Sequence, residues 1–426
     1  MIKRILVGII GLSILTFVIL IMLAWEEEIE PQSPPSANAF SQEKIDRGRV
    51  VAGIANCQSC HTINPDQPYA GGLAFKTDFG TLYSTNITPD ENVGIGKWSQ
   101  EAFNRAMQEG VSRDGSHLFP AFPYTHYANV SNQDLENLYA YIMTREAIST
   151  SPPDNTLLFP FNIRMLQAGW KLLFFKGATI EEDADRGKYL AEGLGHCSAC
   201  HTPRNLLGAE VQGKNYDGTL TNNWYAPSLN VNHNAPVSWT KDELYLYLRK
   251  GVSVYHGVAA GSMSAVVHQG LAEASDEDIR SLADYFYSIS GSGDATQASK
   301  QAASAIRVAQ ERSANSSSRG EALFAYACAS CHFNTPDRPS SLRPELSLNS
   351  AVTADDPTNL IRFTMEGISD EAGIQGTVMP GFSNWNNQDL IALFEFLRET
   401  YTDRPPWDDL ESRIQAIRKS TDQVKE

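Results

Sequence analysis

Two cysteines and one histidine recur at the same spacing in three stretches of the chain. These stretches are Cys57-Gln58-Ser59-Cys60-His61, Cys197-Ser198-Ala199-Cys200-His201 and Cys328-Ala329-Ser330-Cys331-His332. Two thiols one helical turn apart can each add to a vinyl group of the same porphyrin, and the adjacent imidazole can bind its iron as the proximal ligand. The pattern therefore predicts three covalently bound haem c groups, and it uses all 6 cysteines of the chain.

A zinc site and a redox dithiol are the alternative interpretations of a C-x-x-C pair. Zinc needs a second pair of ligands close to the first, whereas the three motifs lie far apart in the chain and each carries its own histidine. A redox dithiol explains neither the histidine nor the threefold recurrence. Haem attachment is the interpretation that accounts for every residue of the motif.

Internal repeats surround the three motifs. Each repeat opens with an Arg-Gly pair, and helical periodicity then predicts a middle helix that ends in glycine and a last helix with an apolar stripe. The Arg-Gly pairs are Arg47-Gly48, Arg186-Gly187 and Arg319-Gly320; the middle helices are Ser99–Gly110, Thr240–Gly251 and Pro357–Gly367; the last helices are Ser131–Met143, Ser275–Ile289 and Asn387–Thr400. The repeats predict a mainly α fold with three tandem haem domains, at residues 40–150, 182–291 and 316–403.

Each iron also needs a second axial ligand unless it is an open site. Met263 follows Gly251 by the same number of residues as Met379 follows Gly367. A thioether is the usual distal ligand in electron-transfer cytochromes c. A lone methionine is more often a gap-filling core residue, but two in the same repeat register favour iron ligation. Both are expected in loops.

The first repeat departs from this register. Phe122, which cannot bind iron, stands where the other repeats have methionine. His126 lies four residues further on in the same ligand loop, so it is predicted as the distal ligand of the first haem. His117 ranks second and Met107, within the middle helix, ranks third. An open first iron with His126 at the surface is the alternative. The remaining histidines are interpreted as surface or packing residues: His196, His233, His256 and His268.

The length and the net charge of the chain limit the classes of function that it can have. A chain of 426 residues suits about three domains. Its net charge of −16 argues against nucleic-acid binding, which needs a basic face. The acidic balance instead favours solubility and electrostatic attraction of a basic partner, such as a soluble basic cytochrome.

The N-terminus predicts a membrane anchor over residues 1–28. The stretch from Ile5 to Trp25 has 21 residues without charge, enough for a spanning helix and longer than the apolar region of a signal peptide. No clear cleavage site follows it, so we expect an uncleaved anchor, although a cleaved signal peptide is the alternative. Lys3 and Arg4 place the N-terminus in the cytoplasm. The haem domains then lie in the periplasm, on the cytoplasmic membrane of a bacterium, behind a tether at Glu30 to Asn38.

Three further segments connect or follow the haem domains. Leu157 to Phe175 is apolar but broken by Pro160, and we expect it to be a connector packed between domains; a surface on the membrane or on a partner subunit is the alternative. In the linker from Gly291 to Arg319, residues 302–312 are expected to be helical. The tail at 404–426 is charged and is expected to be a solvated helix.

The sequence also resembles a known family. Four stretches carry the resemblance: Ser84-Thr85-Asn86-Ile87-Thr88-Pro89-Asp90, Gly94-Ile95-Gly96-Lys97-Trp98-Ser99, Pro120-Ala121-Phe122-Pro123-Tyr124 and Cys200-His201-Thr202-Pro203-Arg204-Asn205. They are similar to the three-haem cytochrome c subunit of membrane-bound bacterial dehydrogenases, a group that includes those for alcohol, gluconate, sorbitol and aldehyde. The resemblance covers nearly everything after the anchor and implies cytochrome c-type domains.

One of these stretches differs from the alcohol- and sugar-oxidising members, which usually have Pro-Ala-Met-Pro-Tyr where this chain has Phe122. This form, together with Phe159-Pro160-Phe161-Asn162-Ile163-Arg164 and Gly169-Trp170-Lys171-Leu172-Leu173-Phe174, looks more like cytochromes that accompany molybdenum hydroxylases. The resemblance implies a catalytic partner that oxidises aldehydes or N-heterocyclic aromatics. A PQQ- or flavin-dependent alcohol or sugar dehydrogenase is the alternative partner.

Electron transfer is the function that these observations predict. The chain has no Gly-rich dinucleotide fingerprint, and its three domains are used by haems. Substrate oxidation is therefore expected on a catalytic dehydrogenase subunit, with quinone, another cytochrome or an oxidase as electron acceptor. Two alternatives are peroxide or gas chemistry at an open first iron, and a membrane-tethered redox store without a fixed partner.

Overall fold

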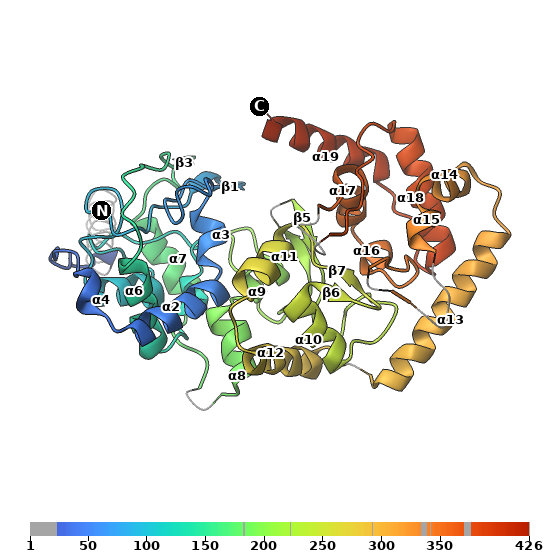
Figure 1. The fold of residues 1–426 in the computed structure, drawn as a ribbon. Helices are drawn as coiled ribbons and strands as arrows, with labels where there is room; N and C mark the ends of the chain where they lie inside the picture. Colours follow the sequence, from blue (N-terminus) through green and yellow to red (C-terminus); the bar gives the residue numbers. More distant parts are fainter. Residues whose placement is uncertain are drawn as a thin grey trace, which may run out of the picture. The chain divides into compact units, whose positions relative to one another are not determined.

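The computed structural model describes residues 24–425, except 182–183, 222, 292, 334–338, 341 and 370–375 (Figure 1). The chain divides into two compact units, Met1–Ala184 with Glu192–His196, and Asp185–Ala191 with Cys197–Glu426. The first unit holds the first C-x-x-C-H motif, and the second unit holds the other two. The predicted anchor lies almost wholly outside the described residues.

The first unit is mainly helical with one small sheet. Its elements are η1 (Ala37–Ala39), α2 (Gln42–Ile54), α3 (Cys57–His61), β1 (Ala74–Thr77), β2 (Gly80–Tyr83), α4 (Gln100–Glu109), α5 (Tyr124–Tyr127), α6 (Asn132–Met143), β3 (Thr156–Leu157) and α7 (Leu166–Phe174). The strands form an antiparallel sheet in the order β1-β2-β3, with Ala74 opposite Tyr83 and Thr81 opposite Thr156.

The second unit repeats the helical pattern twice, around a long connecting helix. The earlier repeat contains α8 (Arg186–Lys188), α9 (Ser198–His201), β4 (Thr219–Thr221), β5 (Trp224–Ala226), α10 (Lys241–Lys250), β6 (Val252–Ser253), β7 (Gly257–Val258), α11 (Ser262–Ala265) and α12 (Asp276–Ile289), with a π-helical turn at Val266–Gly270. Another π-helical turn, Tyr189–Leu194, begins in the second unit and ends in residues of the first. The later elements are α13 (Ala295–Ala314), α14 (Arg319–Ala327), α15 (Ala329–His332), α16 (Ser350–Thr353), α17 (Thr358–Glu366), α18 (Asn387–Tyr401) and α19 (Leu410–Lys425).

The predicted boundaries of the middle and last helices are confirmed, and side-chain caps mark where helices begin. The Ser41 hydroxyl accepts a hydrogen bond from the backbone N–H of Lys44 at the start of α2. Ser99 and Thr240 cap α4 and α10 in the same way. Gly110, at the end of α4, has φ 65°, a left-handed conformation that glycine adopts without steric cost.

The repeated Arg-Gly pair has a packing role that the sequence pattern alone did not reveal. A Cβ atom added to Gly48 would lie 1.9 Å from the carbonyl oxygen of Asn137 on α6. The equivalent distances are 2.1 Å from Gly187 to the carbonyl oxygen of Ser281, and 2.1 Å from Gly320 to that of Ala392. In each repeat, glycine therefore lets the helix before the haem motif cross the last helix at backbone contact.

The linker between the second and third motifs is a longer helix than expected. The prediction covered residues 302–312, whereas α13 runs from Ala295 to Ala314 (Figure 1). Ala298, Ala302 and Ile306 on one face are buried with Val237 and Leu348. The helix is therefore a packed part of the second unit.

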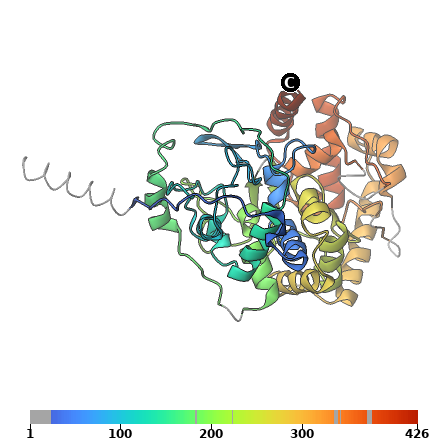
Figure 2. The same cartoon turned by 60° about the vertical axis from the view of Figure 1, so that its left-hand side comes forward.

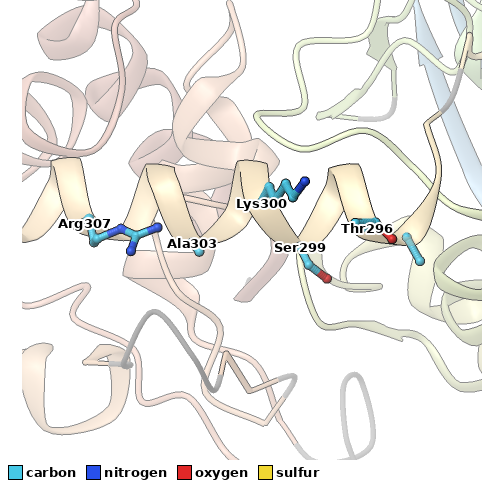
Figure 3. A pocket seen from close by; sticks show the side chains of 6 residues that line it. Thr296, Ser299, Lys300, Ala303 and Arg307 are labelled. Atoms are coloured by element: carbon cyan, nitrogen blue, oxygen red, sulfur yellow. The ribbon is translucent and has the colours of Figure 1, made fainter.

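The opposite side of α13 carries a hollow of about 520 Å³ (Figure 3). It is lined by Ala295, Thr296, Ser299, Lys300, Ala303 and Arg307. All of these residues belong to one helix, so the hollow is an open surface feature.

The expectation of a solvated C-terminal tail is wrong. Trp407, Leu410, Ile414 and Ile417 are buried in the core that also contains Phe394 of α18. Spacings of four and three residues place the last three on one face of α19, the dark red helix that ends the chain in Figures 1 and 2. Each such burial contributes about 1.5–3 kcal/mol, and charged side chains such as Glu411 and Lys419 stay exposed.

The expected free tether after the anchor also differs from the structure. The backbone N–H of Gln32 donates to the carbonyl oxygen of Lys97, and that of Ile29 donates to Arg113. Arg113 further forms an ion pair of 2.7 Å with Glu28. These bonds hold the chain against the first unit before it reaches α2. No helix within the described ranges is both long and apolar enough to cross a membrane.

Much of the segment from Leu157 to Phe175, which was predicted to be a connector packed between domains, lies at the surface of the first unit. Leu158, Phe159, Leu172 and Leu173 are exposed, whereas Gln167 is buried. Helix α7 thus packs through a partly polar face and leaves its leucines outside.

Replacing Gly48 by alanine tests the close helix crossing. The added methyl group must displace the backbone of α6, so Gly48→Ala should lower the free energy of unfolding by about 1–3 kcal/mol. The matched control is Gly169→Ala in α7, where an added Cβ meets nothing within 4 Å; there the better helix former should be neutral or stabilising by up to about 1 kcal/mol. Urea unfolding of the haem-loaded full chain, followed by circular dichroism, would contradict this account if both variants behaved alike.

Candidate haem sites

Each C-x-x-C-H motif forms a single helical turn. The first motif is α3 itself, and in the second the backbone N–H of His201 donates to the carbonyl oxygen of Cys197 at 3.2 Å. The equivalent bond in the third motif joins His332 and Cys328 at 3.0 Å. All 6 cysteines lie in the described part of the chain, and none of them forms a disulfide. The turn brings two thiols and an imidazole together, as haem attachment requires.

The three motif histidines share one hydrogen-bond arrangement. In each, Nδ1 donates to a backbone carbonyl oxygen, which leaves Nε2 as the nitrogen that can bind iron. The bonds are 2.6 Å from His61 to Thr85, 2.7 Å from His201 to Pro227 and 2.9 Å from His332 to Pro344. Burial lowers the pKa of all three histidines, which favours the neutral, metal-binding imidazole. These carbonyl partners were not anticipated from the sequence.

The cysteines also fit covalent attachment. Burial raises the pKa of Cys57 and Cys197 to about 12 and that of Cys328 to about 11. A thioether has no ionisable group, so attachment suits a thiol that is costly to charge. Among the described residues, no three His, Cys, Asp or Glu side chains gather as a metal-ion site. The donor set of two thiols and one oriented imidazole thus fits haem c at each motif.

The two methionines of the repeat register lie in different local structures. Met379 is in an extended segment that exchanges backbone hydrogen bonds of 2.9 and 3.0 Å with Ile368. Met263 was expected in a loop but lies in the short helix α11, after Gly261. Both methionine side chains are partly buried.

Strand β5 lies next to two segments of the second repeat: the one that holds the hydrogen-bond partner of His201, and the one that holds Met263. It leads directly into Pro227, whose carbonyl oxygen accepts the bond from His201. On its other side the Trp224 ring lies against Gly261, where an added Cβ would come within 2.5 Å of the indole. Gly261 precedes Met263 by two residues, so one strand supports both the motif histidine and the methionine segment.

The same strand is bound to α17 of the third repeat. The backbone N–H of Tyr225 donates to the Asn359 side chain at 2.9 Å, and the Asn359 amide donates back at 2.7 Å. Arg362 donates to the carbonyl oxygen of Asn223 at 2.7 Å. The Trp224 and Phe363 rings lie 5.3 Å apart between centroids. Two haem repeats are therefore joined at an element that supports the second site.

The first repeat places its candidate distal residues differently. His126 lies in α5, and its Nδ1 donates to the carbonyl oxygen of Glu192 at 3.0 Å, as the motif histidines donate to theirs. In His117, Nε2 donates to Ala24 and Nδ1 accepts from Lys171, so both nitrogens are occupied. Met107 is a residue of α4, and its side chain is buried in the core. Of the three candidates, only His126 donates from Nδ1 to a backbone carbonyl oxygen, as the motif histidines do.

The histidines that were interpreted as surface or packing residues have varied settings. His256 is buried and stacks on Trp239 with ring centroids 3.6 Å apart. Its burial lowers its pKa to about 3. Neither ring nitrogen of His256 has a hydrogen-bond partner in the described structure. His196 donates to the carbonyl oxygen of Ala55 and lies 5.5 Å from the Tyr127 ring. Both are packing residues.

Comparison with known proteins identifies the family. The Cytochrome c family model matches residues 45–146 and 317–400. The chain is 42% identical over 406 residues to a nicotinate dehydrogenase subunit of Pseudomonas putida, covering 93% of this chain but only 34% of that relative, so it spans about a third of that protein's length.

Two further relatives match along most of their own length. The chain is 35% identical to the gluconate 2-dehydrogenase cytochrome c subunit of Pantoea cypripedii, over 84% of this chain and 85% of the relative. It is 31% identical to the cytochrome c subunit of the quinone alcohol dehydrogenase of Gluconobacter oxydans, over 88% and 82%. The chain belongs to the family of cytochrome c subunits of dehydrogenases.

Proposed function

We propose that this chain is a three-haem c-type cytochrome that carries electrons from a periplasmic dehydrogenase to quinone or a terminal oxidase of the respiratory chain. The observation that carries the proposal is the threefold C-x-x-C-H turn with the same bond from Nδ1 to a carbonyl oxygen. Haem c, when bound, supplies one-electron uptake and release at its iron. The chain's own residues set the potential through ligand type, burial and local charge.

The favoured catalytic partner is a molybdenum hydroxylase type of dehydrogenase that oxidises aldehydes or N-heterocyclic aromatics. The identity of 42% to the nicotinate dehydrogenase relative supports this choice over the 35% and 31% to the gluconate and alcohol dehydrogenase relatives. Phe122 stands in place of the methionine that is usual in the alcohol and sugar group, and this also favours a molybdenum hydroxylase type of partner. A PQQ- or flavin-dependent dehydrogenase is the competing partner.

The proposed axial ligands are His61, His201 and His332 on the proximal side, with Met263, Met379 and His126 on the distal side. Repeat register supports both methionines. The bond from His126 Nδ1 to the carbonyl oxygen of Glu192 supports its role, because the three motif histidines make the same bond from Nδ1. The engagement of both nitrogens of His117 counts against that residue.

The proposed location is the periplasmic side of the cytoplasmic membrane, with the segment from Ile5 to Trp25 as a single-pass anchor. Its length, lack of charge and preceding Lys3-Arg4 support this placement. The net charge of −16 would attract a basic electron-transfer partner by long-range steering.

Purification of the tagged chain from native membranes in mild detergent tests the function. A dehydrogenase subunit should co-purify, and nicotinate or an aldehyde should reduce the haems in an absorbance assay. The mass of the denatured chain should show three haems, and that of a Cys197→Ala, Cys200→Ala variant two. Reduction by gluconate or ethanol alone would favour the competing partner. A chain without any dehydrogenase, reduced by none of these substrates, would contradict the proposed function.

Substitution of His126 tests the first distal ligand. Imidazole in place of thioether lowers a haem potential, so we expect the first haem to have the lowest midpoint of the three. Low-temperature EPR of His126→Ala should show loss of one low-spin signal, while His126→Met should restore a low-spin haem at higher potential. His117→Gln is the control and should keep every signal. If His126→Ala retains all low-spin signals and all midpoints, His126 is not the ligand.

Substitution of Trp224 tests the support of the second distal ligand by β5. Trp224→Ala removes the ring against Gly261, so the Met263 segment should loosen and the midpoint of the second haem should fall. Trp224→Phe should retain most of the wild-type midpoint, and Leu220→Ala on the neighbouring β4 should not change it. Redox titration and the ligand-sensitive absorbance bands measure the effect. An unchanged second haem in Trp224→Ala would contradict this role.

A further inference from the structure

Helix α7 carries an apolar face that the haem sites do not use. Leu166, Leu172 and Leu173 are exposed, and the fractional exposure of Leu172 is 82%. Gly169 lies between them on the helix, and an added Cβ there would meet nothing within 4 Å. Spacings of three and four residues place Leu166, Gly169 and Leu173 on one side of the helix.

The inward face of α7 is the more polar one. Gln167 is buried, and the Lys171 ammonium donates to the carbonyl oxygen of Gly110 at 2.9 Å. Burial lowers the pKa of Lys171 to about 8. Trp170 packs at 6.3 Å from the Tyr124 ring. A helix that turns a lysine inward and leucines outward is the reverse of an ordinary surface helix, so its outer face is suited to an apolar environment.

The chain before α7 is also apolar at the surface. Leu158, Phe159 and Ile163 are exposed, and the fractional exposure of Phe159 is 80%. We refer to these three residues with Leu166, Leu172 and Leu173 as the 158–173 surface. Scattered apolar residues are normal on a protein surface, but six in one short stretch are typical of an interaction site.

The charge around the 158–173 surface differs in sign from that of the whole chain. Residues 155–180 contain Arg164, Lys171 and Lys176 and no Asp or Glu, in a chain of net charge −16. Arg164 and Lys176 are both exposed. Basic side chains beside apolar ones complement a bilayer with anionic headgroups.

A short series of bonds connects α7 to the end of the proposed anchor. The Lys171 ammonium donates to Nδ1 of His117 at 3.0 Å, and Nε2 of His117 donates to the carbonyl oxygen of Ala24 at 2.8 Å. Arg105 donates to the carbonyl oxygen of Glu27 at 2.7 Å. The end of the apolar stretch of 21, at Ala24, is therefore bonded through His117 to Lys171 of α7, and Glu27 just after the stretch is bonded to α4.

We propose that the 158–173 surface inserts into the interfacial layer of an anionic bilayer and sets the orientation of the first haem unit on the membrane. The inference rests on the proposed membrane location. Position favours lipid over a protein partner, because a chain that leaves the bilayer at Trp25 is bonded within a few residues to the inner face of α7. Leucines and phenylalanine then enter the acyl boundary, while Arg164 and Lys176 meet the headgroups.

Site-specific photo-crosslinking in native membranes tests the proposal with the full chain and its complex. Benzoylphenylalanine is introduced at Leu172 or Phe159, and the adducts are identified by mass spectrometry after irradiation. Phospholipid adducts are expected at both positions. The matched control is Leu206 of the second unit, an apolar side chain with a fractional exposure of 95%, where no lipid adduct is expected.

A second control separates this surface from the anchor. Benzoylphenylalanine at Leu15, within the apolar stretch, should give lipid adducts if the anchor spans the membrane. Adducts at Leu15 but none at Leu172 and Phe159 would overturn the 158–173 surface alone. Adducts at Leu172 to peptides of a dehydrogenase subunit or of a second copy would overturn it in favour of a protein interface. Lipid adducts at Leu172 without any at Leu15 would support the surface and contradict the anchor. Haem reduction by substrate in the same membranes reports separately on the electron-transfer function.

Discussion

The hydrogen bond from Nδ1 of each motif histidine to a backbone carbonyl is the constraint on which the haem sites depend. The motif itself fixes only a helical turn, and an imidazole on that turn could still rotate about its side-chain bonds. Thr85, Pro227 and Pro344 stop this rotation, and they come from 24, 26 and 12 residues further along the chain. A site that needs its ligand held closely must therefore hold a distant loop as well.

The glycine at each helix crossing positions the start of every motif. The helix before the motif packs at backbone contact with the last helix of the repeat. This contact fixes the position of the motif's cysteines and histidine relative to the last helix. In the second and third repeats an ion pair adds to this packing: Arg186 binds Asp278 at 2.7 Å, and Arg319 binds Asp389 at 2.6 Å. The ion pairs are partly solvated and contribute little alone, so the close packing is the larger effect.

The second unit joins its two C-x-x-C-H repeats at one structural element. Strand β5 supports the histidine segment and the methionine segment of the second site and is bound to α17 of the third repeat. A change in the structure of either repeat at this element would therefore displace residues that contact the other repeat. The first unit instead bonds the chain before α2 to its own elements, at Ala24 through His117 and at Glu27 through Arg105 of α4.

The sequence by itself determined the chemistry and the local helices. Cys-x-x-Cys-His requires only neighbours one turn apart, and caps such as Ser41 act within four residues, so both are readable from short stretches. The tertiary structure decided which distant groups meet: the carbonyl partners of the histidines, the bond of His126 to Glu192, and the burial of α19. It also decided that α7 turns its leucines outward, because burial depends on what a face packs against and periodicity shows only that a face exists.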